Sequence, residues 1–320
     1  MTLQPATLQD LSDALAEAAR QGSRIASWNL TALNRVIDYT PEDLTVTVEA
    51  GITLAALQAH LRPRGQWLPV DPPEPERLSI GALIAANASG PRRFGHGTIR
   101  EHLLGLQVTL ADGRQIKAGG KVVKNVAGYD LCKLFVGSRG ALGIITAATF
   151  KVQPLPETEL FVEATCDSWS GAATLLEAVS ASPLTPVVLD FHQPPQPARV
   201  QPGRRDLHLV LGCAGTREDV AWQASEARRL GVGSPGSLAY ETAFWKTAAG
   251  QTARRVSVLP ARLIETLQPL GDLSFVARAG NGIVYYHGGP EPPPGPAPGR
   301  LLQRIKDAYD PKHLLPELPL

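Results

Sequence analysis

The chain has 320 residues, and its 31 Lys and Arg against 30 Asp and Glu leave a formal net charge of +1. This balance argues against a nucleic-acid groove or attraction to an acidic membrane surface. Length alone favours two domains. The N-terminus lacks a basic region followed by an apolar run, and no stretch is long and apolar enough to span a bilayer, so we expect a cytoplasmic protein that reaches a membrane only through partners.

The first half of the chain predicts alternating helices and strands. Thr7 is a good helix N-cap, and Leu8, Leu11 and Leu15 follow at helical spacing until Gly22. The predicted elements are a helix over 7–22, a strand over 44–49, a helix over 53–65, a strand over 102–110 joined by a hairpin turn to 115–118, a short helix over 130–135, and a strand over 144–152. Hairpins among the strands indicate an α+β fold and not a doubly wound sheet.

The second half predicts a different domain. Residues 160–230 have the pattern βαββα, and residues 255–309 repeat that order. Such a repeat is typical of two ferredoxin-like halves built around one sheet. The three cysteines, Cys132, Cys166 and Cys213, have no metal-binding or iron–sulfur spacing and are predicted to be buried, reduced thiols.

The most informative stretch is 79–98. An apolar run over 80–86 gives way to small polar residues and glycines, among them Asn87, Gly95 and Gly97. Residues without bulky side chains let the backbone approach a planar or phosphorylated ligand closely. The alternative is a tightly packed turn with no ligand.

Several motifs in and after this stretch resemble those of one known family. Residues 79–90 resemble the flavin-binding segment of the vanillyl-alcohol-oxidase (PCMH-type) family, and 134–146 resemble its closing flavin segment. Gly90-Pro-Arg-Arg and the run Lys124–Leu131 are similar to the FAD-binding E subunit of bacterial glycolate oxidase. The resemblance implies a PCMH-type FAD-binding domain over 1–156 and a ferredoxin-like cap over 157–320.

The resemblance also implies which residues contact FAD. They are Pro73, Glu74, Pro75, Ser79, Ile80, Gly81, Ala86, Asn87, Ala88, Ser89, Gly90, Gly97, Thr98, Gly140, Gly143, Ile144 and Ile145. Arg92 and Arg93 have four competing interpretations: flavin contact, recognition of a substrate carboxylate, docking to another subunit, and a solvated pair at a loop tip.

The function implied is that of an FAD-dependent oxidoreductase subunit in a hetero-oligomer. It would work beside a second flavin subunit and an iron–sulfur subunit in oxidising a small 2-hydroxy acid such as glycolate or lactate. No catalytic base is identified, so the chain is not expected to be active alone. No metal is expected, because neither the pair His96 and His102 nor His287 in the cap belongs to a recognisable cluster of histidines and carboxylates.

One departure from the family concerns the cofactor. Members carry a glycine-rich loop whose N–H groups bind the FAD pyrophosphate, and residues 21–36 lack it. We therefore expect non-covalent, weakened FAD binding, or, if another segment such as Arg24 or Arg92–Arg93 replaces the loop, tight binding. The alternative is a flavin-free structural subunit of the same complex. A reductase related to the peptidoglycan-precursor enzyme of the superfamily is a third interpretation, and it would need an NADPH site that the sequence does not show.

Overall fold

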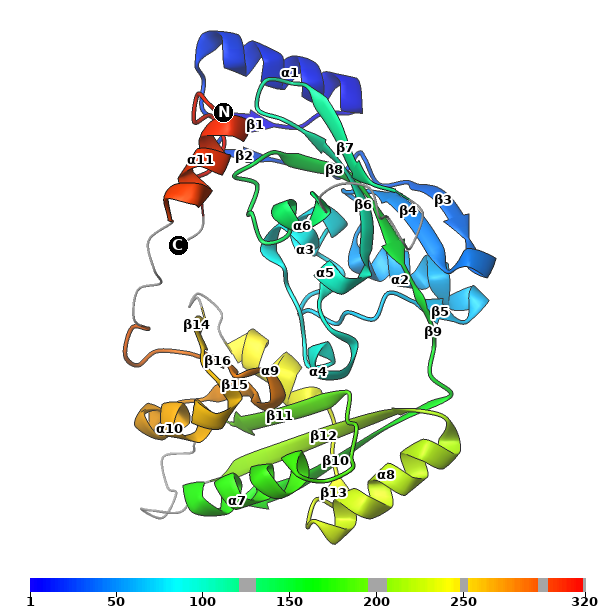
Figure 1. The fold of residues 1–320 in the computed structure, drawn as a ribbon, viewed down its shortest axis with the longest axis vertical. Coiled ribbons are helices and arrows are strands. Elements are labelled where there is room, and N and C mark those ends of the chain that lie inside the picture. The colour runs from blue at the N-terminus through cyan, green and yellow to red at the C-terminus, as the bar shows by residue number, and fades with distance from the viewer. Residues whose placement is uncertain (121–130, 195–205, 248–252, 293–298, 319–320) are drawn as a thin grey trace. The chain divides into compact units, whose positions relative to one another are not determined.

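The computed structural model describes residues 1–120, 131–194, 206–247, 253–292 and 299–318 (Figure 1). The chain forms two compact units, each described by itself. Unit 1 comprises Met1–Ser89, Thr98–Leu155 and Pro294–Leu320, and unit 2 comprises Gly90–Gly97 and Pro156–Pro293. No described helix is long and apolar enough to cross a membrane.

Unit 1 begins with the helix that the sequence predicts. In α1 (Leu8–Gln21), the Thr7 hydroxyl accepts from the Asp10 N–H, and the Asp10 carboxylate accepts from the Thr7 N–H. This capping box satisfies two of the N–H groups that a helix start leaves unpaired. Gly22 ends the helix in the left-handed conformation, with φ 68°. At the start of the helix α2 (Leu54–Leu61), the Thr53 hydroxyl accepts from the Ala56 N–H.

The centre of unit 1 is an antiparallel five-stranded sheet of order β3-β4-β8-β6-β7. Its strands are β3 (Val36–Thr40), β4 (Thr45–Glu49), β6 (Leu103–Thr109), β7 (Gln115–Gly119) and β8 (Ile144–Lys151). Two small sheets flank it, β1 (Thr2–Leu3) with β2 (Ser27–Trp28), and β5 (Gln66–Trp67) with β9 (Gln153–Pro154). The predicted hairpin between β6 and β7 is confirmed.

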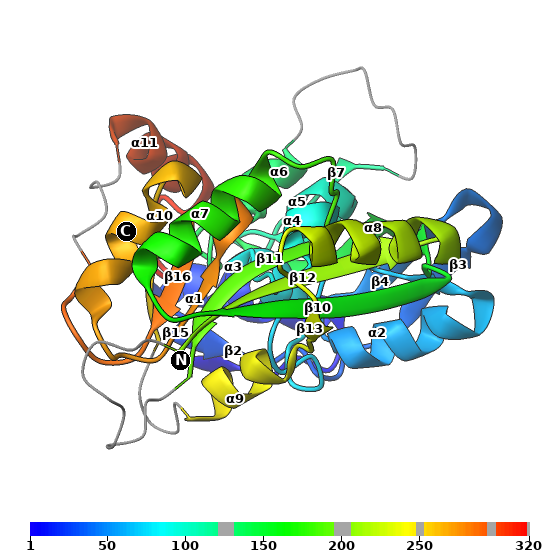
Figure 2. The same cartoon turned by 90° about the horizontal axis from the view of Figure 1, so that it is seen from below.

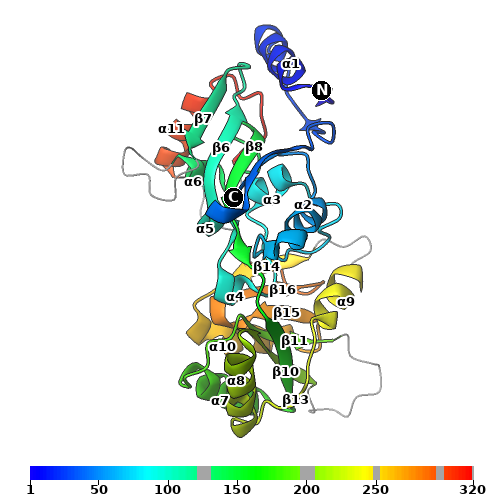
Figure 3. The same cartoon turned by 90° about the vertical axis from the view of Figure 1, so that its right-hand side faces the viewer.

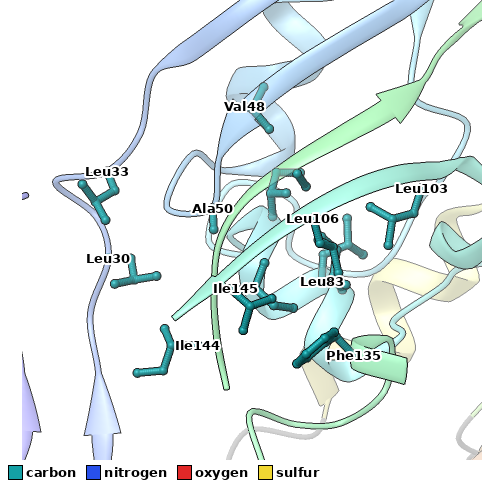
Figure 4. Packing of buried hydrophobic residues seen from close by; sticks show 14 of the residues in the cluster. Leu30, Leu33, Val48, Ala50, Leu83, Leu103, Leu106, Phe135, Ile144 and Ile145 are labelled. Atoms are coloured by element: carbon teal, nitrogen blue, oxygen red, sulfur yellow. The ribbon is translucent and has the colours of Figure 1, made fainter. Parts of the chain in front are cut away.

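Helices cover the sheet and bury the core. They are α3 (Ile80–Ala86), α5 (Ile99–His102) and α6 (Cys132–Phe135), with α2 beside α3 (Figure 3). Figure 4 shows Leu83 of α3 and Phe135 of α6 next to Leu106 of β6 and Ile145 of β8, all buried. The apolar run 80–86 is thus a helix whose buried side chains anchor it to the sheet, which the sequence pattern did not resolve.

Unit 2 is built on one antiparallel sheet of order β13-β10-β12-β11-β15-β16-β14. Its strands are β10 (Thr158–Cys166), β11 (Val188–Gln193), β12 (Leu207–Gly215), β13 (Ser234–Pro235), β14 (Arg254–Ser257), β15 (Phe275–Arg278) and β16 (Ile283–Tyr286). The two halves meet at the β11–β15 pair, each contributing its second strand. The prediction of two similar halves around a single sheet is therefore confirmed for the strands and for the first helix of each half.

Helices cover one face of this sheet and a further helix lies on the other (Figure 2). Buried side chains of α7 (Trp169–Ser180), α8 (Arg217–Arg229) and α10 (Leu263–Leu267) pack on the apolar face. The helix α9 (Ala239–Thr247), which the sequence analysis missed, contributes polar contacts to the opposite face. The cysteines Cys132, Cys166 and Cys213 are free and buried, as predicted.

A short helix from the middle of the first half belongs to unit 2. In α4 (Arg93–His96), a Cβ added at Gly95 would lie 2.6 Å from the Cα of Val187, and a Cβ at Gly280 would lie 2.1 Å from the ring of Phe94. These close approaches require glycine at both positions.

The last helix belongs to unit 1, although its place in the repeat assigned it to the cap. In α11 (Arg300–Tyr309), Ile305 and Tyr309 pack on the core of unit 1. The fully buried ammonium of Lys306 binds the Asp310 carboxylate at 2.7 Å and the Ala141 carbonyl at 2.9 Å. The pattern of elements carried no information about this long-range contact.

Candidate cofactor-binding site

Unit 1 contains a cavity of ≈ 590 Å³, a size typical of small-molecule sites. Three segments and Gly51, which follows β4, line it: β2 with the turn after it, the helix α3 with the loop before it, and the turn that leads into β8. The lining residues are Trp28, Asn29, Leu30, Thr31, Gly51, Arg77, Ser79, Gly81, Ala82, Ala85, Ala86, Arg139, Gly140, Gly143 and Ile145.

The structure brings together part of the set predicted from the sequence. The predicted residues at the cavity are Ser79, Gly81, Ala86, Gly140, Gly143 and Ile145. Ile80 and Ile144 are fully buried in the core instead. Those of unit 1 that are not among the lining residues are Pro73, Glu74, Pro75, Asn87, Ala88, Ser89 and Thr98. Gly90 and Gly97 belong to unit 2, and the motif around Lys124 lies outside the described residues.

Glycines allow the three segments to meet. A Cβ at Gly81 would lie 3.1 Å from the Cβ of Ala50, and one at Gly140, where φ is +81°, would lie 2.4 Å from the ring of Trp28. The Trp28 ring therefore rests against the turn before β8. The sequence analysis missed Trp28 because only the fold shows that it faces Gly140.

The backbone approaches most closely at Gly51, and we predict that a side chain at this position strongly destabilises the protein. A Cβ there would lie 1.8 Å from the Leu30 carbonyl oxygen, so the backbone must shift. Gly51→Ala is expected to lower the free energy of unfolding by about 1–3 kcal/mol, as overpacking does. Gly120→Ala, whose Cβ would meet nothing within 4 Å, is the matched control. Urea denaturation measures both, and equal effects would contradict the prediction.

The cavity combines an apolar wall with positive charge. Leu30, Ala85 and Ile145 supply apolar surface, whereas Arg77 and Arg139 supply two guanidinium groups, and no acidic side chain is among the described lining residues. Directly after α3, the Asn87 Oδ1 atom is buried and has no hydrogen-bond partner among the described residues. A close-walled cavity with these properties fits a large, partly planar and anionic ligand.

The polar face of unit 2 carries a buried charge network. The Arg278 guanidinium donates to the carboxylates of Asp190 and Glu241, and the Tyr240 hydroxyl donates to Asp190 at 2.7 Å. Arg278 and Asp190 are both at most 2% exposed. Burial raises the pKa of Asp190 to about 6, although the Arg278 charge acts to lower it.

A second cluster on this sheet corrects the sequence analysis, which found no group of histidines and carboxylates in the cap. His192 and His208 face each other on β11 and β12, and Glu163 of β10 lies beside them. The two imidazole rings stack at 4.8 Å and 8°, and Tyr240 stacks on the other side of His192. Burial lowers the pKa of His192 to about 3. Because nearly parallel rings do not direct their in-plane lone pairs to one point, this stacked geometry does not form a metal site.

Two further predicted candidates are engaged within unit 2. The Arg92 guanidinium forms two bonds to Glu159, at 2.7 and 2.5 Å, and lies 5.6 Å from the centre of the Phe161 ring. The His287 Nε2 atom lies 3.2 Å from the Phe244 carbonyl oxygen, and the two rings stack. Arg92 thus recognises a carboxylate, but one of its own chain.

Comparison with known proteins identifies the domain that holds the cavity. Residues 1–119 match a family model described as an FAD binding domain. This part of the chain is similar to an FAD-binding domain of the PCMH type. The residues that line the cavity fit the FAD that this description names.

Relatives extend the similarity beyond residue 119 but not over the whole chain. Glycolate oxidase subunit GlcE of Escherichia coli is 40% identical over 126 residues, which are 39% of this chain and 36% of the relative. Subunit GlcD of Bacillus subtilis is 37% identical over 163 residues, 51% of this chain and 35% of the relative. A probable mitochondrial D-lactate dehydrogenase of Danio rerio is 43% identical over 142 residues, 43% of this chain and 28% of the relative. The matched regions thus span about a third of these relatives.

A solved structure shows the same fold over nearly the entire chain. Alkyldihydroxyacetonephosphate synthase aligns with a TM-score of 0.73 over 98% of this chain and 75% of its own, at 17% identity. At this identity the likeness concerns the fold alone. It covers both the FAD-binding domain and the cap.

Proposed function

We propose that this chain is an FAD-binding subunit of a complex that oxidises a small 2-hydroxy acid such as glycolate or lactate. The observation that carries the proposal is the cavity, whose walls contain Ser79, Gly81 and Gly140 from the two flavin-like segments. The relatives named as glycolate oxidase subunits and D-lactate dehydrogenases support the substrate class.

When bound, FAD would supply a redox centre that accepts electrons released by oxidation of the substrate. The residues of this chain bind and orient the FAD. Gly81 and Gly140 let the backbone come close to the ligand, and Leu30 and Ile145 offer it an apolar surface. Ser79 fixes the start of α3, because its hydroxyl accepts from the Ala82 N–H at 3.3 Å.

We further propose that the hydroxy acid is oxidised on a second flavin subunit. A 2-hydroxy acid carries a carboxylate, which a guanidinium would pair. Among the arginines of unit 2 that form ion pairs within the described residues, Arg278 and Arg92 are the least exposed. Both guanidinium groups already pair with carboxylates of the chain. A partner that supplies the substrate site, and an iron–sulfur subunit that accepts electrons, would complete the enzyme.

The test compares the chain alone with the chain co-expressed with such partners. The single chain is expected to reduce dye acceptors with glycolate or D-lactate at no useful rate, whereas the co-purified complex does so readily. Absorbance spectra of both preparations report the flavin content. Robust turnover by the single chain, or a chain that remains monomeric beside the partners, would contradict the proposal.

A structural subunit without flavin is the second candidate. It is favoured by the Trp28 ring, which lies against Gly140 in the cavity wall. No binding at high FAD concentration, together with a complex that still assembles, would support this candidate.

A further inference from the structure

We infer that Arg77 and Arg139 bind the pyrophosphate of FAD, in place of the glycine-rich loop that residues 21–36 lack. The inference rests on the proposed FAD binding and adds the groups that recognise the diphosphate. The turn Trp28–Thr31, which occupies the position of that loop in the chain, lines the same cavity as both arginines. The loop and its replacement would therefore act on one region of the ligand.

Many backbone N–H groups at or next to the cavity wall are already used within the protein. The amides of Asn29, Thr31, Gly51, Ile80, Gly81, Ala82 and Arg139 donate to Leu3 O, Asn29 Oδ1, Leu33 O, Ile52 O, Ala50 O, Ser79 Oγ and Ala85 O, respectively. A nest of free amides is the usual backbone site for a phosphate. Because these amides are engaged, the arginine side chains are the charged donors that an anion in the cavity would meet.

Both guanidiniums are available to an anion. Arg139 is exposed and forms no ion pair among the described residues. Arg77 lies 3.5 Å from Glu74, but its side chain is 82% exposed, and such surface pairs are weak and easily exchanged. A guanidinium fork matches two phosphate oxygens at once, so two of them suit a diphosphate ester.

The backbone conformation of Arg139 also suggests that this residue has a function. Its φ is +50°, between Gly137 and Gly140, which both have φ +81°. This conformation favours glycine, so an arginine there keeps local strain, which is often stored at functional sites. The Arg139 N–H donates to the Ala85 carbonyl at 2.9 Å, which ties the residue to α3.

The arginines suggested from the sequence are placed elsewhere. Arg24 lies 3.6 Å from Glu317 and does not line the cavity. Arg92 pairs with Glu159 in unit 2. Neither replaces the loop at this cavity.

The experiment measures ligand affinity of the flavin-stripped full-length protein by fluorescence and calorimetric titration. The variants are Arg77→Gln, Arg139→Gln, the double variant, and Arg62→Gln, an exposed arginine outside the cavity. The probes are FAD, riboflavin, which lacks phosphate, and inorganic pyrophosphate. Each cavity variant is expected to weaken FAD and pyrophosphate binding about 10- to 100-fold, as loss of a charge-assisted bond does. Riboflavin binding and the Arg62→Gln control should stay within about twofold of the wild type.

Arg139→Gly separates binding from folding. Glycine removes the guanidinium and relieves the strain, so this variant should fold at least as stably as the wild type and still lose FAD affinity. Equal losses for FAD and riboflavin, or unchanged FAD affinity in the double variant, would overturn the inference. If the wild type bound pyrophosphate through the two arginines but not FAD, the diphosphate site would stand, whereas FAD as its ligand and the proposed function would fall. If it bound neither, both would fall.

Discussion

Replacing Lys306 with methionine is expected to lower the free energy of unfolding of unit 1 by about 3–5 kcal/mol, the usual cost of leaving one member of a buried ion pair alone. The ammonium group binds the Asp310 carboxylate at 2.7 Å and the carbonyls of Ala141, Leu315 and Pro316 at 2.9, 3.3 and 2.9 Å. Methionine keeps the length of the side chain but donates no hydrogen bond, so all four acceptors lose this donor, and the Asp310 carboxylate keeps the N–H groups of Leu314 and Leu315.

The measurement is peptide-resolved hydrogen exchange in urea, because a chain of two units need not unfold in one step. Arg304→Met, on the exposed side of the same helix, should change stability by no more than about 0.5 kcal/mol. The double variant Lys306→Met with Asp310→Asn should recover part of the loss, since it leaves no buried charge. A loss below about 1 kcal/mol for Lys306→Met alone would contradict this account. Because Lys306 holds the Ala141 carbonyl next to Gly140 of the cavity, FAD affinity should fall as well.

Replacing Arg278 with methionine should destabilise unit 2 by a similar amount, about 3–5 kcal/mol. The guanidinium is the shared partner of Asp190 and Glu241, and Asp190 is 1% exposed. Without Arg278 two carboxylates remain buried together. Arg262→Met, which breaks an exposed pair with Glu265, is the matched control and should cost at most about 1 kcal/mol. Exchange of the β11 and β15 amides in urea reports the difference.

The same network predicts a pH dependence of unit 2. Burial raises the pKa of Asp190 from its ordinary value of 3.8 to about 6. Between these values the folded protein holds a proton that the unfolded chain has released, so stability falls as the pH rises through this window. We expect the stability difference between the wild type and Asp190→Asn to change between pH 4 and pH 6 and to be level above pH 7. A difference that is constant over the whole range would refute the assignment.

Local patterns allowed much of the fold to be predicted. The caps at Thr7 and Thr53 and the turn before Gln115 depend on residues close in sequence, and the alternation of strands and helices identified the cap repeat. The site was predicted only where a motif supplied it, as for Ser79, Gly81 and Gly140.

What escaped prediction depends on contacts between distant residues. Nothing near Trp28 or Arg139 in the sequence indicates that both face one cavity. Likewise, the stacked histidines His192 and His208 lie 16 positions apart and meet only because β11 and β12 pair in one register. The placement of helix α11 in unit 1 was not predicted for the same reason, because Lys306 binds the carbonyl of Ala141, which is distant in the sequence.

Unit 1 is assembled from three separate stretches of the chain, the last of which includes α11. On the ribosome, the five-stranded sheet would therefore emerge long before the helix that packs on Phe135 and supplies Lys306. The main part of unit 2, Pro156–Pro293, leaves the ribosome in between, whereas its insert Gly90–Gly97 emerges before the sheet is complete. Domains usually fold in the order of their synthesis, but here the N-terminal half must wait for α11, so the cap can be complete first. The cofactor would then be loaded only after α11 has emerged, when Lys306 holds the turn at Ala141 in place.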